Sequence, residues 1–209
     1  MIVSSSWQLV ALALMVCGTI QAAEEPKPEA PAAGLAVGEL LPTFESTDEQ
    51  GLPWKSVDHV GKKVLVLYFY PGDFTGGCIK QAEAYRDGLT KIEELGVELV
   101  GVSGDEVATH KLFKETYGLK HALLADSKGE LAKLVGVLVS AGGRVAPTTP
   151  DRKPILDADG KRIIFQRPVT LARWTVVVDR EGKIASVRKI VNPVTDSEEV
   201  RKFVEALPK

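Results

Sequence analysis

The chain carries two kinds of hydrophobic pattern, which alternate along most of its length. Residues 64–70, VLVLYFY, form a continuous apolar and aromatic run that is typical of a strand buried on both faces. After a glycine-rich turn, apolar side chains recur at spacings of three and four and predict an amphipathic helix that ends at Gly96. These apolar positions are Ile79, Ala82, Tyr85, Leu89, Ile92 and Leu95.

The alternation continues towards the C-terminus. The pattern predicts strands at 97–103, 122–124, 174–179 and 184–191, and helices at 109–117 and 129–135. The last two strands are joined by Arg180-Glu181-Gly182, which indicates a hairpin. The final helix begins at a capping box, Thr195–Glu198, and its apolar face consists of Val200, Phe203, Val204 and Leu207.

This order of elements predicts the fold class. Strands alternate with helices and are followed by a hairpin and a last helix, which indicates an α/β sandwich with a mixed central sheet and helices on both faces. Active sites of such folds lie at the carboxyl ends of the central strands. The segment that follows Tyr70 is therefore the first place to look for chemistry.

An insertion at residues 140–170 interrupts the alternation. Its first part, SAGGRVAPTTPDRKP, has the composition of a loop. Residues 155–158 and 161–165 flank Asp159-Gly160 and predict an extra hairpin. Because the insertion leads directly to Arg173, it either overhangs a pocket there or decorates the surface, and both interpretations stay open.

The N-terminal segment 1–23 contains no Asp, Glu, Lys or Arg and holds an apolar run from Trp7 to Ile20. Small residues follow up to Ala23, so the segment resembles a secretory signal peptide that is cleaved near its end. An uncleaved membrane anchor is the alternative, although the run is shorter than the roughly 20 apolar residues that span a bilayer. We therefore expect an exported protein, periplasmic or extracellular.

A second N-terminal segment, residues 24–35, is rich in Pro, Ala and Glu and predicts a flexible linker. The folded domain is then expected at residues 36–209, with the insertion inside it. Of the 209 residues, 44% are hydrophobic and 26% are charged, which is typical of a globular chain of one domain.

The net charge and the number and spacing of cysteine and histidine residues limit which ligands and partners are expected. The formal net charge of −2 gives no overall basic field, so we expect neither nucleic-acid binding nor a stable membrane contact after cleavage. Two cysteines exclude a disulfide-rich scaffold and a four-thiolate metal site. His59, His110 and His121 lack ligand spacing, so neither a metal nor a cofactor is predicted. Asp105 and His110 are interpreted as the solvated start of a helix rather than as catalytic groups.

Cys78 is the residue whose position points to chemistry. It follows the buried strand and lies at the first turn of the predicted helix, where unpaired backbone N–H groups and the helix dipole favour a thiolate. Since the thiolate is the nucleophile, this position favours a reactive cysteine over an inert buried one. Cys17, the other cysteine, belongs to the predicted signal peptide and would leave with it.

The sequence around Cys78 resembles a known family. The pattern Pro71-x-x-x-Thr75-x-x-Cys78 is similar to the peroxidatic signature of the peroxiredoxins, the alkyl hydroperoxide reductase and thiol-specific antioxidant family. Residues 68–75 resemble its bacterioferritin-comigratory, or Q-type, branch, and residues 173–179, RWTVVVD, resemble its Arg-x-Thr strand. In order along the chain, the likeness covers approximately residues 36–139 and 171–207.

The resemblance implies a thioredoxin-like fold and a thiol-dependent peroxidase with an antioxidant role in cell redox homeostasis. Cys78 would attack an oxygen of hydrogen peroxide or an alkyl hydroperoxide and become a sulfenic acid. Thr75 would hydrogen-bond the thiolate and the peroxide, and Arg173 would stabilise the thiolate and the leaving oxygen. The N–H groups of Gly77 and Cys78 would bind the distal oxygen. Pro71 would shape the pocket and keep water from the sulfur.

One departure from the family changes the expected mechanism. Many Q-type members carry a resolving cysteine five residues after the peroxidatic one, where this chain has Glu83. The sulfenic acid therefore needs an external thiol, either a small molecule or a thioredoxin-like reductant. The oligomeric state expected for such an enzyme is a monomer or a homodimer.

Two alternative functions use the same fold. A redox sensor with one cysteine would be oxidised at Cys78 without turnover and would pass its state to a partner through a mixed disulfide. A thiol–disulfide oxidoreductase needs a C-x-x-C pair, but Thr75 and Gln81 occupy the two positions open to a second cysteine. The sequence disfavours the oxidoreductase and leaves the sensor open.

Overall fold

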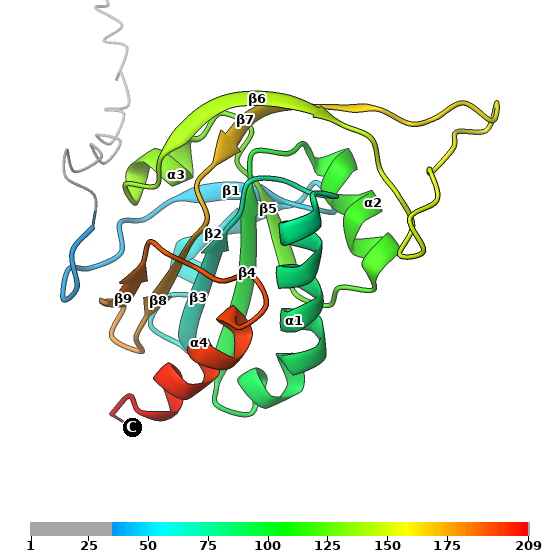
Figure 1. Ribbon diagram of the computed structural model, residues 1–209. Helices are drawn as coiled ribbons and strands as arrows, with labels where there is room; N and C mark the ends of the chain where they lie inside the picture. The colour runs from blue at the N-terminus through cyan, green and yellow to red at the C-terminus, as the bar shows by residue number, and fades with distance from the viewer. Residues whose placement is uncertain (1–34, 209) are drawn as a thin grey trace, which may run out of the picture.

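Seven strands form the central sheet of the structure, a computed structural model that describes residues 35–208 (Figure 1). Their order across the sheet is β2-β1-β5-β4-β3-β8-β9. The strands are β1 (Glu45–Asp48), β2 (Pro53–Lys55), β3 (Val64–Phe69), β4 (Val97–Ser103), β5 (Ala122–Ala125), β8 (Trp174–Val178) and β9 (Ile184–Arg188). The predicted signal peptide, residues 1–23, and residues 24–34 of the predicted linker lie outside the described residues.

The sheet is parallel at its centre and antiparallel at its margins. Strands β3, β4 and β5 run parallel, whereas β8 is antiparallel to β3 and β1 is antiparallel to β5. Every residue of β3 is buried, as its continuous apolar run predicts for a strand covered on both faces. The prediction of a mixed central sheet is confirmed.

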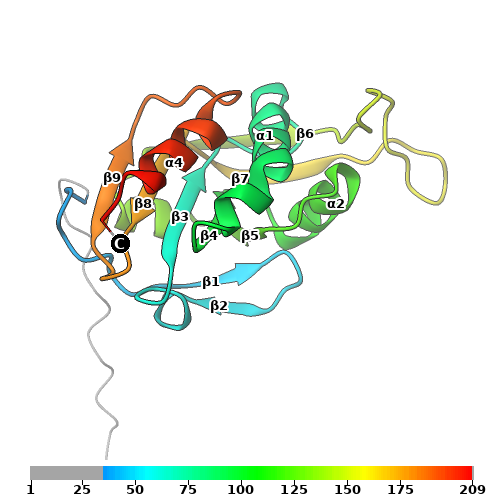
Figure 2. The same ribbon diagram turned by 90° about the horizontal axis from the view of Figure 1, so that it is seen from below.

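Helices cover both faces of this sheet, as predicted. They are α1 (Gly76–Glu93), α2 (Val107–Tyr117), α3 (Glu130–Leu134) and α4 (Asp196–Glu205). On one face, Val66 of β3 shares a core with Ile92 of α1 and Val200 of α4, and these two helices lie side by side (Figures 1 and 2). On the other face, Leu67 of β3 shares a core with Leu131 of α3. Within residues 35–208, none of the helices combines the length and the apolar character that a bilayer crossing requires.

Two glycines end helices where the sequence pattern predicts. Gly96 follows α1 with a φ of 74°, and Gly118 follows α2 with a φ of 64°, both in the left-handed region that favours glycine. The predicted capping box at α4 is wrong. Thr195 makes no side-chain cap, and the Glu198 carboxylate accepts instead from the Arg201 guanidinium at 2.8 Å, one turn further along the exposed face of the helix.

The insertion contains two strands that the sequence pattern does not predict. β6 (Val139–Val145) and β7 (Phe165–Leu171) pair antiparallel in a second, two-stranded sheet. The loop predicted from residue 140 is therefore wrong for β6, whose sequence VSAGGRV shows no alternation because most of its residues are partly exposed. We call β6, residues 146–164 and β7 the β6–β7 arm. Residues 146–164 extend away from the body of the molecule (Figure 1).

At the far end of the β6–β7 arm, the predicted hairpin is reduced to a tight turn. The Asp157 N–H donates to the Lys161 carbonyl at 2.8 Å, and Gly160 has a φ of 74°. A bridge between Leu156 and Arg162 is the extent of strand pairing here. The turn residues were thus identified correctly from the sequence, but β7 begins later than the predicted second strand, at Phe165.

The hydrophobic pattern also does not predict β1 and β2. Both are short, and the side chain of Trp54 is the buried one in β2. The Trp54 ring stacks on Phe44, with ring centroids 5.4 Å apart, and on His59, with centroids 4.1 Å apart. Tertiary contacts of this aromatic stack, rather than a periodic apolar pattern, hold these strands at the margin of the sheet.

Candidate active site

The site lies where β3 and β4 end and β8 begins. β3 ends at Phe69, and the turn of residues 70–75 leads into α1. Because β8 is antiparallel to β3, with Trp174 opposite Phe69, Arg173 reaches the same edge of the sheet. The sequence prediction placed the chemistry at the carboxyl ends of the central strands, and these residues gather there.

Cys78 is the third residue of α1 and is 1% exposed. The helix begins after Thr75, whose carbonyl accepts the N–H of Ile79 at 2.9 Å. Helix geometry leaves the N–H groups of Gly77 and Cys78 without intrahelical partners, so they point along the helix axis towards the site. An anion or a partially charged oxygen in front of this helix end is stabilised by these groups and by the helix dipole.

Arg173 contacts the sulfur directly. Its Nη2 donates to Cys78 Sγ at 3.1 Å, which brings together two residues that lie 95 positions apart in the sequence. A permanently charged guanidinium at this distance favours the thiolate over the neutral thiol. A Cβ atom on Gly77 would lie 3.2 Å from Arg173 Nη2, so the glycine leaves the space through which the guanidinium reaches the sulfur.

A buried network holds Arg173 in place. Arg173 Nη1 donates to Gln81 Oε1, and Gln81 Nε2 donates in turn to Asp196 Oδ2 at 2.8 Å. Gln81 lies three residues after Cys78 on α1, and this spacing puts both side chains on one face of the helix. The guanidinium is thus fixed from behind by the same helix that carries the sulfur.

Asp196, at the start of α4, is the fixed point of this network. Its Oδ2 also accepts from the Tyr85 hydroxyl at 2.7 Å and from Thr175 Oγ1 at 2.8 Å, while its Oδ1 accepts from Arg188 at 3.1 Å. Burial and the Asp196 charge raise the pKa of the Tyr85 phenol well above its usual range, so the phenol remains a donor. We call Arg173, Gln81, Asp196 and their partners the sulfur-side network.

Sequence reasoning found only part of the sulfur-side network. Arg173 and Thr175 belong to the Arg-x-Thr strand of the family resemblance. Asp196 was interpreted as part of a capping box, and Gln81 was noted only because it occupies a position where a C-x-x-C pair would need its second cysteine. A fully buried acidic residue requires partners, and Asp196 is fully buried. The sequence shows only an acidic residue at a helix start and gives no sign of its burial.

Thr75 and Pro71 lie in the turn between β3 and α1, and both are half-buried. Thr75 Oγ1 donates its one proton to the Gly72 carbonyl at 2.9 Å, so in this arrangement the hydroxyl stabilises the turn and offers the site its lone pairs. Pro71 is the first residue after the aromatic run that ends at Tyr70. Both predicted residues therefore lie in the turn that leads to Cys78, and the hydrogen bond from Thr75 to the sulfur stays a prediction.

The turn holds one residue in a strained backbone conformation. Phe74 has a φ of 56°, which is uncommon for a bulky side chain. Its ring packs against Phe113 and Tyr117 of α2, with ring centroids 5.1 Å and 6.0 Å away. A conformation of this kind persists only where the surroundings fix it from several sides.

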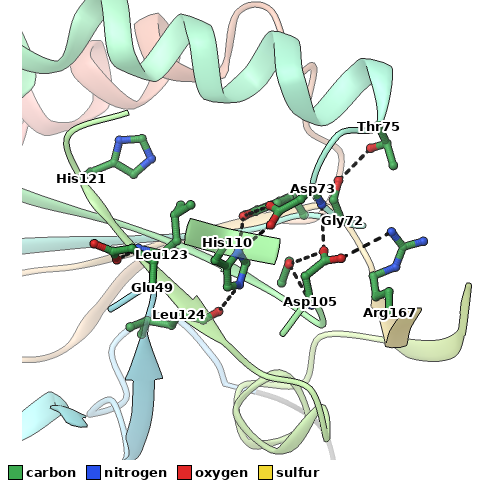
Figure 3. A network of polar contacts seen from close by, with 12 residues as sticks. Glu49, Gly72, Asp73, Thr75, Asp105, His110, His121, Leu123, Leu124 and Arg167 are labelled. Carbon is green, nitrogen blue, oxygen red and sulfur yellow. Dashed lines mark hydrogen bonds and ion pairs between the residues drawn. The ribbon is translucent and has the colours of Figure 1, made fainter. Parts of the chain in front are cut away.

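A second buried network supplies such fixation from below the turn (Figure 3). The Tyr70 hydroxyl donates to Asp73 Oδ1 at 2.8 Å, and His110 Nδ1 lies 2.8 Å from Asp73 Oδ2. The backbone N–H of Asp73 donates to Asp105 Oδ2, also at 2.8 Å. Asp73, Asp105 and His110 are fully buried, so the interpretation of Asp105 and His110 as a solvated face is wrong. We call these residues, together with Arg167, the loop-side network.

Burial and mutual charge shift the ionisation of the loop-side network. Burial and the Asp73 charge raise the pKa of Asp105 to about 6. Burial lowers the pKa of His110, but the charge and the hydrogen bond of Asp73 outweigh it, and the pKa of His110 is raised. The fold therefore keeps two carboxyl groups and an imidazole together without solvent, against the turn of residues 70–75.

Among residues 35–208, no three or more His, Cys, Asp or Glu side chains are grouped so that they could hold a metal ion, and Cys78 is the free cysteine. Glu83, at the position of the resolving cysteine in many relatives, pairs with Arg86 at 3.8 Å on the surface of α1. The arrangement offers one thiol, one guanidinium and a helix N-terminus, and these are groups for nucleophilic attack on a small electrophile.

Comparison with known proteins assigns this site to a family. A sequence model of the AhpC/TSA family matches residues 37–187. The chain belongs to the AhpC/TSA family. Chloroplastic peroxiredoxin Q of Oryza sativa subsp. japonica is 40% identical over 124 residues, which are 59% of this chain and 55% of the rice protein. Chloroplastic peroxiredoxin Q of Triticum aestivum is 38% identical over 144 residues, 66% of this chain and 64% of the wheat protein.

Two solved structures share the fold. Peroxidoxin BcpB from Mycobacterium tuberculosis superposes with a TM-score of 0.65 at 25% identity, over 83% of this chain and 98% of that chain. Xanthomonas campestris peroxiredoxin Q superposes with a TM-score of 0.60 at 23% identity, over 78% and 90%. The predicted thioredoxin-like fold and the predicted likeness to Q-type peroxiredoxins are confirmed. The chain spans between about half and two thirds of the length of the curated relatives above.

Proposed function

We propose that this chain is a thiol-dependent peroxidase that reduces hydrogen peroxide and alkyl hydroperoxides at Cys78. The observation that carries the proposal is the 3.1 Å contact between Arg173 Nη2 and Cys78 Sγ in front of the N-terminus of α1. Membership of the AhpC/TSA family supports the same chemistry. A thiolate held by a guanidinium, next to free backbone N–H groups, is suited to attack an oxygen that carries a leaving group.

In the first step, the Cys78 thiolate attacks the terminal oxygen of the peroxide. The S–O bond forms as the O–O bond breaks, the sulfur is oxidised to a sulfenic acid, and the leaving alkoxide or hydroxide takes up a proton to become an alcohol or water. The N–H groups of Gly77 and Cys78 bind the distal oxygen, and Arg173 stabilises the negative charge that develops on it. Thr75 orients the peroxide, and Pro71 limits the access of water to the sulfur.

In the second step, an external thiol reduces the sulfenic acid. Its thiolate attacks Cys78 Sγ, water leaves, and a mixed disulfide forms; a second thiol then releases Cys78 and carries away the disulfide. Two observations support an external thiol: Glu83 occupies the position of the resolving cysteine, and Cys78 is the free cysteine of residues 35–208. We propose a small thiol or a thioredoxin-like protein as the reductant, acting on a monomer or a homodimer.

Peroxide consumption in the presence of dithiothreitol tests the activity. We expect turnover by the natural protein and none above background for Cys78→Ser. In the natural protein, mass spectrometry should detect a trapped sulfenic acid on Cys78. Turnover by Cys78→Ser would overturn the mechanism. Consumption that stops after one equivalent of peroxide would favour the redox sensor, and rapid reduction of insulin would favour the thiol–disulfide oxidoreductase.

We further propose that the chain is exported to the periplasm or the extracellular space and that residues 1–23 are a cleaved signal peptide. The uncharged apolar segment followed by small residues supports this proposal. The intact mass of the protein recovered from the exported fraction tests it, and a mass that includes residues 1–23 would contradict cleavage.

A further inference from the structure

The β6–β7 arm sits directly on the turn that carries Cys78. A Cβ atom on Gly72 would lie 2.0 Å from Arg167 Nη1, and one on Gly104 would lie 2.1 Å from the Val169 carbonyl oxygen. Both distances are shorter than any real contact. At Gly104 the neighbour is the backbone of β7, so β7 lies against the loop after β4 only because this position is glycine, and at Gly72 the glycine leaves the space that the Arg167 side chain occupies. The arm is therefore part of the active-site architecture rather than a surface decoration.

Arg167 is the charged residue that the β6–β7 arm brings to this place. Its Nη1 lies 4.0 Å from Asp105 Oδ1, and its side chain is 11% exposed (Figure 3). Within the described part of the chain, neither of these two atoms has a hydrogen-bond partner, although both are buried. The two groups carry opposite charges within ion-pair distance, and in a buried setting such an attraction is weakly screened.

Asp105 transmits this attraction to the turn. Its Oδ2 accepts from the backbone N–H of Asp73 and from Ser103 Oγ, both at 2.8 Å. Asp105 therefore ties the turn to the end of β4. The point of attachment in the turn is Asp73, one residue before the strained Phe74. A carboxylate binds these donors more strongly than a neutral acid does, so the grip on the turn depends on the charge of Asp105.

We propose that Arg167 is a positioning residue for the reaction of Cys78: acting through Asp105, it fixes residues 71–77 in the conformation that aligns the sulfur with Arg173. The proposal rests on the peroxidase function proposed above. Arg167 contacts neither the sulfur nor the peroxide in this role. The β6–β7 arm would thereby support the catalytic turn.

The proposal predicts a specific pH dependence. Four ionisable groups meet at Asp105: Asp73 of the turn, His110 of α2, Arg167 of β7 and, through Asp73, Tyr70 at the end of β3. As pH falls through about 6, Asp105 takes up a proton and its attraction for Arg167 is lost. The rate at which peroxide oxidises Cys78 should decline with it. Removal of the Arg167 charge makes ionisation of Asp105 harder and should move this midpoint to higher pH.

The test compares Arg167→Gln, Arg167→Lys and a control on the same arm, Arg144→Gln, whose side chain is exposed on β6. The rate of Cys78 oxidation is measured by rapid mixing and mass spectrometry from pH 5 to pH 8. At pH 7, we expect Arg167→Gln to be slower by about tenfold, the size of coupling seen within one polar network. Its midpoint should shift upward, Arg167→Lys should recover most of the rate, and Arg144→Gln should match the natural protein.

A second set of variants separates positioning from general stability. In an Asp105→Asn background the charge that Arg167 acts on is absent, so Arg167→Gln should change the oxidation rate by less than about twofold. The reduction of the sulfenic acid by dithiothreitol should not slow in Arg167→Gln, because Cys78 is 1% exposed and a thiol must displace the turn to reach it. If Arg167 had a merely structural role, Arg167→Gln would slow both oxidation and reduction. Its effect on the oxidation rate would then be as large in the Asp105→Asn background as in the natural protein.

Amide hydrogen exchange tests the positioning role of Arg167 without measuring peroxidase activity. We expect the amides of residues 73–78 to exchange about tenfold faster in Arg167→Gln than in the natural protein, with exchange in β3 and β4 unchanged. Natural exchange rates and an unchanged pH profile in Arg167→Gln would overturn the positioning role. A natural protein that does not react with peroxide would overturn the proposed function, while the exchange result would still decide whether Arg167 fixes the turn.

Discussion

Two buried polar networks flank Cys78, and they use the same kinds of residue differently. In the sulfur-side network, Asp196 fixes Gln81, and Gln81 fixes the guanidinium that contacts the sulfur. In the loop-side network, Asp105 fixes the backbone of the turn and has no contact with the sulfur. The first network places a charge next to the sulfur, whereas the second holds the backbone of the turn that leads to it.

The two networks should control different properties of the protein. A guanidinium 3.1 Å from the sulfur acts on the charge that moves during the reaction, so its loss should affect the chemical step. A carboxylate that binds a backbone N–H acts on conformation, so its loss should affect stability and pH dependence as much as rate. The following variants test whether the networks divide in this way.

The largest effect is expected for Arg173→Met, which removes the charge next to the sulfur but keeps much of the side-chain volume. The rate of Cys78 oxidation should fall by about 10³-fold, as for the loss of one strong donor to a developing negative charge. Stopped-flow kinetics with hydrogen peroxide measure it, with Arg144→Met as the exposed control. A loss smaller than tenfold would mean that the helix N-terminus, rather than Arg173, provides most of the stabilisation.

A large loss of stability is expected for Asp196→Asn. The substitution removes the charge that Arg188 pairs with and places an N–H₂ group among four donors, so buried donors lose their acceptor. The free energy of unfolding should fall by about 3 kcal/mol, as measured by urea denaturation. Asp87→Asn, at an exposed position of α1, is the matched control. An unchanged unfolding midpoint in Asp196→Asn would show that the sulfur-side network contributes geometry without stability.

The loop-side network should give the protein a pH-dependent stability. The pKa of Asp105 is about 6 in the folded chain and 3.8 in the reference state, so the folded chain binds more protons between these values. Stability should therefore fall as pH rises from about 4 to 6, by on the order of 2 kcal/mol. The raised pKa of His110 acts in the same direction and extends the decline above pH 6.5.

The variant Asp105→Asn checks that assignment. Urea denaturation at several pH values should show a flatter dependence between pH 4 and pH 6 for Asp105→Asn than for the natural protein. The part of the decline that lies above pH 6.5 should become smaller but remain, because the Asp105 charge helps to raise the pKa of His110 while Asp73, the larger cause, is unchanged. An identical slope in both proteins between pH 4 and pH 6 would assign that titration to another group.

The smallest effect is expected for Gly77→Ala. The added methyl group would lie 3.2 Å from Arg173 Nη2, so the guanidinium must shift by a few tenths of an ångström. We expect the oxidation rate to fall roughly tenfold, since small misplacements of a catalytic group are costly, while alanine keeps the helix. Gly76→Ala is the control, because a Cβ atom there meets nothing within 4 Å. Equal rates for the two variants would show that Arg173 tolerates displacement.

The elements around Cys78 follow from local sequence patterns. The continuous run of β3, the spacing of three and four in α1 and the glycine at the end of α2 are local patterns, and local patterns follow from backbone geometry and burial. The same locality placed Cys78 in the first turn of a helix. The resemblance then added Arg173, whose position next to the sulfur no periodicity in the sequence indicates.

Contacts between residues far apart in the sequence depend on the packing of the whole fold. Gln81 and Asp196 lie 115 positions apart, and Asp73 and Asp105 lie 32 apart, so neither pair leaves a periodic signal in the chain. The strands of the β6–β7 arm are also set by tertiary contact, because they pair with each other, lie against Gly72 and Gly104, and bury Val145 and Leu171 in the core. Burial turns these acidic residues from apparent surface groups into fixed points of the site, because an ionised carboxylate without solvent must have partners.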